Sequence, residues 1–521
     1  MLPKEDLKLN TICTASNLIS SVIIPYRKYI HKDSPIQASR HISTYLTPKY
    51  TEQETVSIIE HVIDGVKVYQ FVPKQVTNLD EILKNDVSSS TSSSSFSRSS
   101  TSTSHNLSEN LKNGEKEEKT PENSQKIKKL PQLPTMFYYH GGAFSYYSVI
   151  KEYKNLIAKL SKLLNIQIFS PEYHLAPEHP YPRQFQDCFF TTVHILRNNL
   201  KYKVDLENFT ICGDSAGGQL TCAISYKLAE RNEFKPKLIA PLYPALQTVY
   251  VKQLPSQRGV GTRKKLLTTT STTKAVLTMT GHDGFNPKYQ KYMKRGYHLP
   301  VDSLNDTKFM RTISPKLYLD QEKFGSAEEI DVSDIKKFQN QNQQNQQKNA
   351  PRNFSTNFIS KKFQISKNFS KKPKPSEIKE FQIFTQKMKT LINDPIFNIG
   401  CISDEKLSYF ITRGPKKYIF SIADCDPLRD EAIIFSKRLE CFGADIKYKV
   451  DKGMPHGYFS IAGILGGYLK EYDRYVIEWL REVNEIVHDF KSFGELENEY
   501  KESFEGIGGE GCFRAEVVVL K

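Results

Sequence analysis

The stretch that decides the fold is Phe209-Thr-Ile-Cys-Gly-Asp-Ser-Ala-Gly-Gly218. Its apolar start, Phe209–Cys212, predicts a short buried strand, and the segment after it, Gln219–Ala229, has the apolar spacing of a helix. Between the two lies the pattern Gly-x-Ser-x-Gly, which in this context places a serine hydroxyl on a sharp turn at the carboxyl edge of a sheet. We therefore predict Ser215 as a nucleophile, although the same spacing also occurs in ordinary glycine-rich turns.

The residues next to Ser215 have the properties that such a turn requires. Gly213 and Gly217 lack the side chains that would clash where the chain doubles back. The helix that begins after the serine directs its first backbone N–H groups and the positive end of its dipole toward the hydroxyl. The N–H of Ala216 is therefore a predicted donor to negative charge on a substrate.

A second motif, His140-Gly-Gly-Ala-Phe144, directly follows the apolar run Met136–Tyr139, which we predict as a buried strand. Acyl transfer builds negative charge on a carbonyl oxygen, and each preorganised N–H donor at that oxygen is worth about 3–4 kcal/mol. We expect the N–H groups of Gly141, Gly142 and Ala216 to form this oxyanion hole. The alternative is a tight loop after a strand, but the position upstream of the serine favours the oxyanion function.

An acid and a base follow late in the chain. Asp426 and His456 each come just after a predicted strand. The order Ser215, Asp426, His456 matches the order of a Ser-Asp-His triad on an α/β sheet and differs from the protease orders. In this interpretation the histidine takes the serine proton, and the aspartate holds the imidazole. Asp424 and Asp430 are rivals for the acid; we rank Asp426 first because it lies at the strand end, whereas Asp430 suits the start of a helix.

Strand-like runs and helical patterns alternate along most of the chain. The predicted strands are Met136–Tyr139, Ile166–Ser170, Phe209–Cys212, Lys237–Leu242, Tyr418–Ala423 and Asp445–Val450, and the predicted helices are Tyr153–Leu164, Gln184–Asn198, Gln219–Ala229, Asp430–Phe442 and Gly466–Val487. A strand pair, Thr55–Ile63 and Lys67–Val72, is also predicted around an Asp-Gly turn. This alternation predicts an α/β fold with a mostly parallel sheet and helices on both faces.

Two segments have compositions that bury too little apolar area to offset chain entropy. Ser88–Ser104 is almost wholly Ser and Thr, and Gln339–Asn349 is a Gln/Asn tract. They divide the chain into an N-terminal region (1–85), a disordered linker (86–131), two parts of the core (132–325 and 381–487) around a disordered insert (326–380), and a C-terminal tail (488–521).

Composition excludes several classes of protein. The 521 residues are 38% hydrophobic and carry a formal net charge of +15, from 73 Lys and Arg against 58 Asp and Glu. The basic residues are spread widely and follow no zinc-finger or RNA-binding pattern, so we predict no nucleic-acid partner. No apolar run reaches the roughly 20 residues that span a bilayer. The eight cysteines show no paired spacing and the N-terminus lacks signal-peptide features, so we expect a cytoplasmic protein with reduced thiols.

Taken together, five segments resemble the hormone-sensitive lipase family of α/β-hydrolases. They are His140–Phe144, Tyr173-His-Leu-Ala-Pro-Glu-His-Pro-Tyr-Pro182, Gly213–Gly218, Asp426-Pro-Leu-Arg-Asp430 and His456-Gly457. Two further segments, Tyr181–Phe190 and Leu242–Ala245, are similar to the hormone-sensitive lipases themselves.

The resemblance implies an α/β-hydrolase fold with an N-terminal helical cap over the pocket and low-complexity inserts. It also implies carboxylic ester hydrolysis through an acyl-serine intermediate, with no metal or organic cofactor. In the family the first Asp of Asp-Pro-Leu is the catalytic acid, about 30 residues before the histidine, and this position falls on Asp426. His140, Gly213 and Gly217 are then structural parts of the motifs, and Tyr173 is expected to support the floor of the site.

The sequence departs from the family pattern at Ala143, where a third glycine is usual, and at Gln219, where asparagine is usual. Since Ala143 is small, we expect activity to survive. The leading hypothesis is a lipase or esterase acting on acylglycerols or other apolar acyl esters. The alternatives are a small-molecule carboxylesterase or deacetylase and, from another class, a non-catalytic ligand receptor; the presence of His456 argues against the receptor. Peripheral contact with lipid droplets or membranes and the oligomeric state are left open.

Overall fold

The computed structural model describes residues 34–46, 55–74, 132–247, 254–258, 266–294, 375–460 and 470–488. The predicted linker (86–131), most of the predicted insert (326–374) and the predicted tail beyond residue 488 lie outside these ranges.

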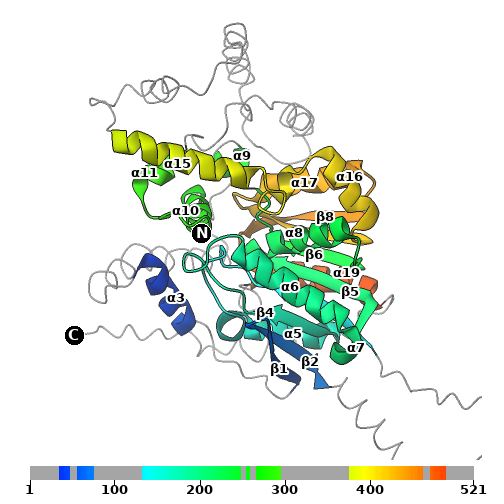
Figure 1. Cartoon of the computed structure of the whole chain (residues 1–521). Helices are drawn as coiled ribbons and strands as arrows, with labels where there is room; N and C mark the ends of the chain where they lie inside the picture. Colours follow the sequence, from blue (N-terminus) through cyan, green and yellow to red (C-terminus); the bar gives the residue numbers. More distant parts are fainter. Residues whose placement is uncertain are drawn as a thin grey trace, which may run out of the picture.

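One eight-stranded sheet forms the centre of the described structure, in the order β1-β2-β4-β3-β5-β6-β7-β8 (Figure 1). Its strands are β1 Val56–Ile63, β2 Val66–Pro73, β3 Leu133–Tyr139, β4 Gln167–Pro171, β5 Val204–Asp214, β6 Leu238–Leu242, β7 Lys417–Cys425 and β8 Ile446–Pro455. The neighbours from β4 to β8 pair in parallel, whereas the β1–β2 and β2–β4 pairs are antiparallel. The prediction of a mostly parallel α/β sheet is therefore confirmed.

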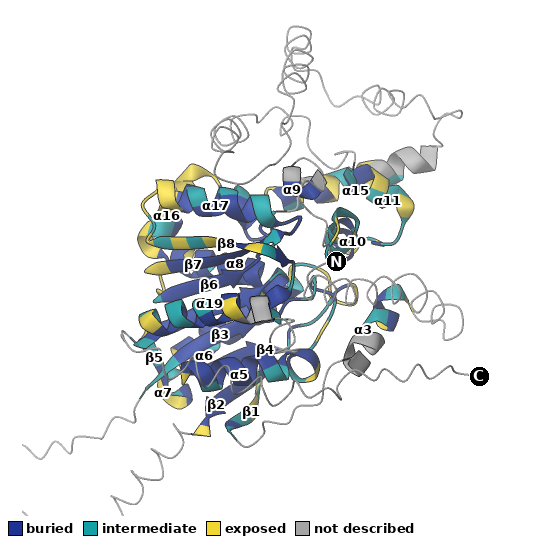
Figure 2. Cartoon of the chain, turned by 180° about the vertical axis from the view of Figure 1, so that it is seen from behind, coloured by how far each residue is buried: buried dark blue, intermediate teal, exposed yellow. Residues whose placement is uncertain are grey.

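Helices cover both faces of this sheet (Figures 1 and 2). The described helices are α3 Pro35–Leu46, η2 Val149–Tyr153, α5 Lys154–Leu164, α6 Arg183–Arg197, α7 Asn199–Tyr202, α8 Ala216–Arg231, α9 Pro255–Arg258, α10 Thr269–Met279, α11 Pro287–Lys294, α15 Pro375–Ile392, η4 Ile399–Cys401, α16 Asp404–Arg413, α17 Arg429–Cys441 and α19 Lys470–His488. One apolar core joins the sheet to α5 and α19, and a second joins it to α6, α8 and α17. Every residue of β4 and β6 is buried, as expected for parallel strands covered on both sides.

Local sequence explains where two of the helices end. Asn165 ends α5 and Asn232 ends α8, each in the left-handed conformation with φ of 48° and 53°. Asparagine tolerates this conformation better than most residues, and its backbone N–H closes the last turn of the helix. Short apolar strands and capped helices therefore alternate at the spacing that the sequence predicts.

The structure corrects two of the expected boundaries. The N-terminal region (1–85), expected to form the cap, also contains the predicted strand pair. Residues 56–73 form this pair as β1 and β2, and they belong to the central sheet because β2 pairs with β4 and buries Val68 and Phe71. Of the described N-terminal residues, only α3 remains outside the sheet. Residues 375–380, the end of the predicted disordered insert, form the first turns of α15. This helix is ordered because Phe384 and Met388 pack against α10 and α11.

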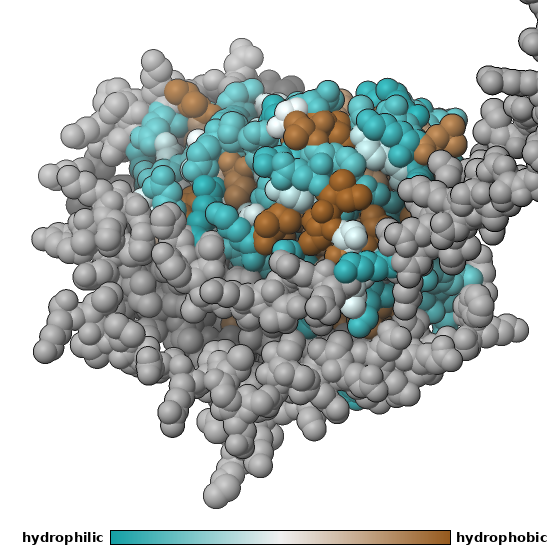
Figure 3. Space-filling view, turned by 90° about the horizontal axis from the view of Figure 1, so that it is seen from below, coloured by the Kyte–Doolittle hydropathy of each residue, from teal (hydrophilic) through white to brown (hydrophobic). Residues whose placement is uncertain are grey.

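None of the helices that the structure describes is both long and apolar enough to cross a bilayer. Seen from below, the described face is largely hydrophilic, and hydrophobic side chains gather there only in small separate groups (Figure 3).

Candidate active site

Ser215 lies on the turn between β5 and α8, at the carboxyl edge of the sheet. Its backbone has φ 55° and ψ −114°, a conformation that non-glycine residues rarely adopt. Three backbone hydrogen bonds hold it: the Ser215 N–H donates to the carbonyl of Leu242 at 2.9 Å, and its own carbonyl accepts from the N–H groups of Gln219 at 3.1 Å and Ala245 at 3.2 Å. The serine is therefore fixed between the end of the neighbouring strand and the first turn of α8.

The two motif glycines are required by close backbone approach. A Cβ atom at Gly217 would lie 1.8 Å from the carbonyl oxygen of Tyr139, and one at Gly213 would lie 2.5 Å from the same atom. Real Cβ contacts essentially never fall below 3.0 Å. The turn can therefore pack against the end of β3, where the oxyanion motif begins, only with glycine at both positions.

His456 connects the serine to an aspartate. Its Nε2 lies 2.8 Å from Oγ of Ser215, and its Nδ1 lies 2.6 Å from Oδ2 of Asp426. Asp426 is 1% exposed, and its other oxygen accepts the N–H of Leu428 at 2.9 Å. A carboxylate at Nδ1 keeps the proton on that nitrogen, which leaves Nε2 free to accept the serine proton. The structure thus brings the three predicted side chains into one hydrogen-bonded row.

The rival acids face elsewhere. Asp424 contacts the guanidinium of Arg429 at 3.4 Å and accepts the N–H of Gly453 at 3.2 Å. Asp430 lies in the first turn of α17 and accepts from Arg429 Nε at 2.9 Å and from Ser256 N–H at 2.8 Å. Of the three acids in this segment, Asp426 is the one that contacts the histidine.

The predicted oxyanion donors divide into two groups, and one prediction is wrong. The N–H of Gly141 points inward and donates to Oδ1 of Asp214 at 2.9 Å, so it does not face a substrate. Within the described residues, the amides of Gly142 and Ala216 have no acceptor in the chain. The next residue, Ala143, has φ 53° after Gly142 with φ 106°. Successive amides in such a loop form a concave site for an anion, so we replace Gly141 by Ala143 in the set of candidate donors.

His140 has a structural position, as its motif predicts. It is completely buried, and its ring stacks on that of Tyr173 with centroids 4.2 Å apart. Burial lowers the pKa of His140 to about 4, which keeps the imidazole neutral, and Nδ1 contacts the carbonyl of Gly141 at 2.7 Å. The Tyr173 hydroxyl donates to the carbonyl of His140 at 2.8 Å. Tyr173 thus supports the start of the oxyanion loop, whereas the resemblance placed it at the floor of the site.

Asp214, the first variable position of the pattern Gly-x-Ser-x-Gly, organises the site. Its carboxylate is 2% exposed. Oδ1 accepts from Tyr138 Oη at 3.0 Å and from Gly141 N–H, and Oδ2 accepts from Tyr153 Oη at 2.7 Å and from Ser460 Oγ at 2.8 Å. Burial raises the pKa of Asp214, while these four donors favour its charged form. The carboxylate therefore joins the oxyanion loop to the segment that carries His456.

A second connection reaches the histidine itself. The Tyr243 ring packs edge-on against the His456 ring, with centroids 5.0 Å apart. The Tyr243 hydroxyl accepts the N–H of Ser460 at 3.2 Å and lies 3.0 Å from its Oγ. Tyr243 follows β6 directly, so the end of this strand limits the rotation of the catalytic imidazole.

Gln219, the departure from the usual asparagine, has a structural role. Its Nε2 donates to the carbonyl of Phe397 at 2.7 Å and reaches that of Ile396 at 3.3 Å. The longer side chain therefore ties α8 to the segment that leads out of α15. Its backbone N–H contacts the carbonyl of Ser215, whereas its side chain contacts this distant segment.

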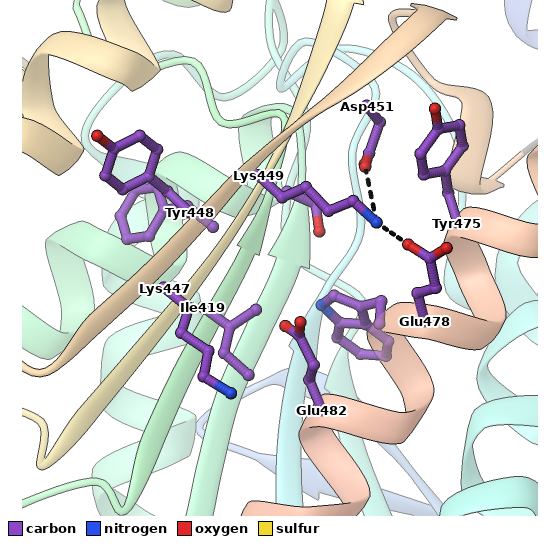
Figure 4. Close-up of a pocket in the computed structure, with 11 residues that line it drawn as sticks. Ile419, Lys447, Tyr448, Lys449, Asp451, Tyr475, Glu478 and Glu482 are labelled. Atoms are coloured by element: carbon purple, nitrogen blue, oxygen red, sulfur yellow. Dashed lines mark ion pairs between the residues drawn. The ribbon is translucent and has the colours of Figure 1, made fainter.

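A pocket of the described structure lies away from the triad. Among the described residues, no group of three or more His, Cys, Asp or Glu side chains is arranged to hold a metal ion. The pocket lies between β8 and α19, where Lys449 forms ion pairs with Glu478 and, at 3.9 Å, with Asp451 (Figure 4). None of the predicted site residues lines this pocket.

The fold and this site define an α/β-hydrolase, and comparison with known proteins agrees. A family model described as the alpha/beta hydrolase fold matches residues 136–296. Arylacetamide deacetylase from Oryctolagus cuniculus is 38% identical over 128 residues, which are 24% of this chain and 32% of the relative. The Mus musculus arylacetamide deacetylase is 26% identical over 339 residues, 63% of this chain and 69% of the relative.

A third relative is neutral cholesterol ester hydrolase 1 from Rattus norvegicus, which is 36% identical over 124 residues, 23% of this chain and 30% of the relative. Residues 136–296 thus match the α/β-hydrolase fold family, and the chain is similar to arylacetamide deacetylase and to neutral cholesterol ester hydrolase 1. It spans only about a third of the length of the rabbit and rat relatives.

Proposed function

We propose that this chain is a serine carboxylic ester hydrolase that acts on apolar acyl esters. The observation that carries the proposal is the row Ser215–His456–Asp426, with hydrogen-bonding distances of 2.8 and 2.6 Å. An inactive receptor on the same fold has no need of a base within reach of the serine hydroxyl, so this geometry favours an enzyme.

The geometry supports a two-step reaction. His456 Nε2 takes the proton of Ser215 as Oγ attacks the ester carbonyl carbon, and the C=O electrons move onto the oxygen. The backbone N–H groups of Gly142, Ala143 and Ala216 stabilise this oxyanion. The tetrahedral intermediate then expels the alcohol, which receives the proton from His456 and leaves an acyl-serine. A water molecule, deprotonated by the same histidine, attacks the acyl carbon, and Oγ leaves with the proton to regenerate the serine.

The class of substrate is supported by the relatives' names, which refer to an arylacetamide and to a cholesterol ester. Both are apolar acyl compounds. We infer that the substrates here are esters with an apolar acyl or alcohol part, such as acylglycerols. A small-molecule deacetylase is the second candidate, favoured by the relatives that carry the name arylacetamide deacetylase.

Hydrolysis of a series of p-nitrophenyl esters from acetate to palmitate tests both candidates. We expect activity that disappears in Ser215→Ala and His456→Ala while the fold, measured by circular dichroism, is retained. Activity that rises with acyl length supports the lipase, and activity confined to acetate and butyrate supports the deacetylase. A folded wild-type protein as inert as Ser215→Ala on every ester contradicts the proposal.

We also propose a cytoplasmic protein that makes peripheral contact with lipid surfaces, on the basis of the net charge of +15 and the apolar substrate class. Flotation with vesicles containing anionic lipid at low salt measures this contact. Protein that stays entirely in the dense fractions contradicts it.

A further inference from the structure

Three elements that are distant in the sequence meet at one guanidinium, that of Arg40 in α3. Its Nε donates to the carbonyl of Ser145 at 2.8 Å, and its Nη2 donates to the carbonyl of Ala176 at 2.8 Å. Nη1 and Nη2 also reach the two carboxylate oxygens of Glu178, at 3.0 Å each. The planar, multidentate guanidinium suits such a junction in a way that a lysine ammonium does not.

The loop that Arg40 contacts has an unfavourable backbone. Ala143, Phe144 and Tyr147 have φ of 53°, 59° and 73°, all in the left-handed region although none is glycine. Each such residue is strained and keeps this conformation only where the surrounding structure holds it. The oxyanion loop therefore depends on contacts from outside itself.

Two adjacent carbonyl groups provide those contacts. The carbonyl of Phe144 accepts the N–H of Ala176 at 2.9 Å, and the carbonyl of Ser145 accepts from Arg40. The Nη2 group of Arg40 also donates to the carbonyl of Ala176. Ala176 and Arg40 thus bind the peptide groups that join Phe144 to Ser145 and Ser145 to Tyr146, one residue beyond Ala143. Without the guanidinium, one of the two external contacts on this part of the loop is lost and the other is loosened.

Helix α3 is built to present this arginine. Its first turn is closed by Ser34 and Gln37: the Gln37 N–H donates to Oγ of Ser34 at 3.2 Å, and the Ser34 N–H donates to Oε1 of Gln37 at 2.9 Å. This reciprocal capping fixes the start of the helix. Ile36 and Ala38 are buried, at 5% and 0% exposure, so α3 is docked rather than loosely attached next to the loop.

We propose that Arg40 is a positioning residue for ester hydrolysis: α3 holds the oxyanion loop in its active conformation through the two carbonyl bonds. The inference rests on the proposed function, because it concerns the oxyanion hole of that same site. A cap helix is expected to affect how the acyl chain binds; this one acts on the transition state instead. The ion pair with Glu178 is secondary, since both side chains are partly exposed, at 25% and 46%.

The experiment compares Arg40→Met, which keeps the apolar stem without donors, with Arg40→Lys and with the matched control Glu178→Gln. Kinetics are measured with p-nitrophenyl acetate, whose acyl group is too short to need a cap, and binding with a trifluoromethyl ketone that forms a tetrahedral adduct with the serine. Loss of a whole oxyanion donor lowers kcat by about 10²–10³. Because Arg40→Met displaces the donors without removing them, we expect kcat to fall about 10- to 100-fold.

In Arg40→Met we expect a lower kcat with a KM within about threefold of wild type. The inhibition constant of the trifluoromethyl ketone should rise by the same factor as kcat/KM falls. Arg40→Lys should recover part of the lost kcat. Glu178→Gln is expected to stay within about twofold of wild type, because both carbonyl bonds remain. An effect of Arg40→Met on KM alone, or an equal effect of Glu178→Gln, overturns the inference and leaves the proposed function intact. A wild-type protein as inert as Ser215→Ala overturns the proposed function and the inference with it.

Discussion

Asp426→Asn exchanges one oxygen for an NH₂ group, and the contacts of the site determine where that group lies. Oδ1 of Asp426 accepts the N–H of Leu428 at 2.9 Å, so the asparagine keeps its carbonyl oxygen at this position. The NH₂ group then faces Nδ1 of His456, where the carboxylate oxygen lies at 2.6 Å. Because an NH₂ group only donates, Nδ1 must act as the acceptor and the imidazole proton moves to Nε2.

In this tautomer, Nε2 directs an N–H at Oγ of Ser215, 2.8 Å away, and is unable to take its proton. The same exchange in the Ser-His-Asp template lowers kcat by about 10⁴ through the same change of tautomer. This factor corresponds to a loss of about 5.5 kcal/mol of transition-state stabilisation. We expect a loss of this size for Asp426→Asn with p-nitrophenyl acetate, with little change in the thermal unfolding midpoint because the new side chain is isosteric.

The matched control is Asp424→Asn, two residues away. Asp424 contacts Arg429 and Gly453 instead of the histidine, so we expect its amide to leave kcat within about threefold of wild type. The two variants are compared at the same pH, with the unfolding midpoint of each measured in parallel. Equal losses in both variants, or more than about a tenth of wild-type activity in Asp426→Asn, would falsify the assignment of the acid.

Three further predictions concern stability and are measured by urea unfolding. Gly217→Ala places a Cβ 1.8 Å from a backbone carbonyl oxygen and should lower the free energy of unfolding by at least about 3 kcal/mol. The control Gly65→Ala, at φ 81° with no atom within 4 Å of the new Cβ, should lower it by about 1–2 kcal/mol. Equal losses in the two variants would show that the turn around Gly217 relaxes freely. Ser460→Ala removes one of the four donors to buried Asp214 and should cost about 1–3 kcal/mol; an unchanged midpoint would contradict the network. Burial raises the pKa of Glu431 from 4.5 to about 8, so the folded protein binds this proton more tightly than the unfolded chain does. The resulting stabilisation of the fold is complete below pH 4.5 and is lost as the pH rises through about 8. In Glu431→Gln, the free energy of unfolding should therefore fall less between pH 5 and pH 9 than it does in the wild type. Because the group is buried, the difference should be about the same in low and high salt. Parallel plots of stability against pH for the two proteins would contradict the raised pKa of Glu431.

The sheet could be predicted wherever burial on both faces produces an uninterrupted apolar run. All five residues of β6 are buried, and the predicted strand 237–242 matches it within one residue. The start of β5 was missed because Val204–Asn208 alternates with charged residues, and only the part from Phe209 onward is uniformly buried. Helix α10 was not predicted because it is rich in threonine, and α15 was not predicted because its sequence follows a long polar segment. Both helices form because they pack together in the folded protein, although their local sequences do not favour a helix.

In the site, local motifs were predictable and long-range contacts were not. Ser215 and the glycines around it lie within one short stretch, whose spacing reflects the geometry of a single turn. By contrast, Ser460 and Asp214 are 246 residues apart, and Arg40 and Glu178 are 138 residues apart. Nothing in the spacing of a serine or an arginine indicates such a partner. The error at Gly141 has the same origin, because its inward N–H is explained only by the buried carboxylate of residue 214.

The position of that carboxylate explains how a strained turn and a distant histidine loop keep their relative geometry. Burying a charge costs several kcal/mol, and an apolar residue at 214 would avoid this cost. It would also leave the amide of Gly141 and the hydroxyls of Tyr138, Tyr153 and Ser460 without their common acceptor, at about 1–3 kcal/mol for each buried donor. Because the four donors come from the oxyanion loop, from β3, from η2 and from the segment after His456, their convergence fixes the base and the oxyanion loop relative to the serine. The buried carboxylate beside the nucleophile therefore aligns the site, and its four donors offset the cost of burying it.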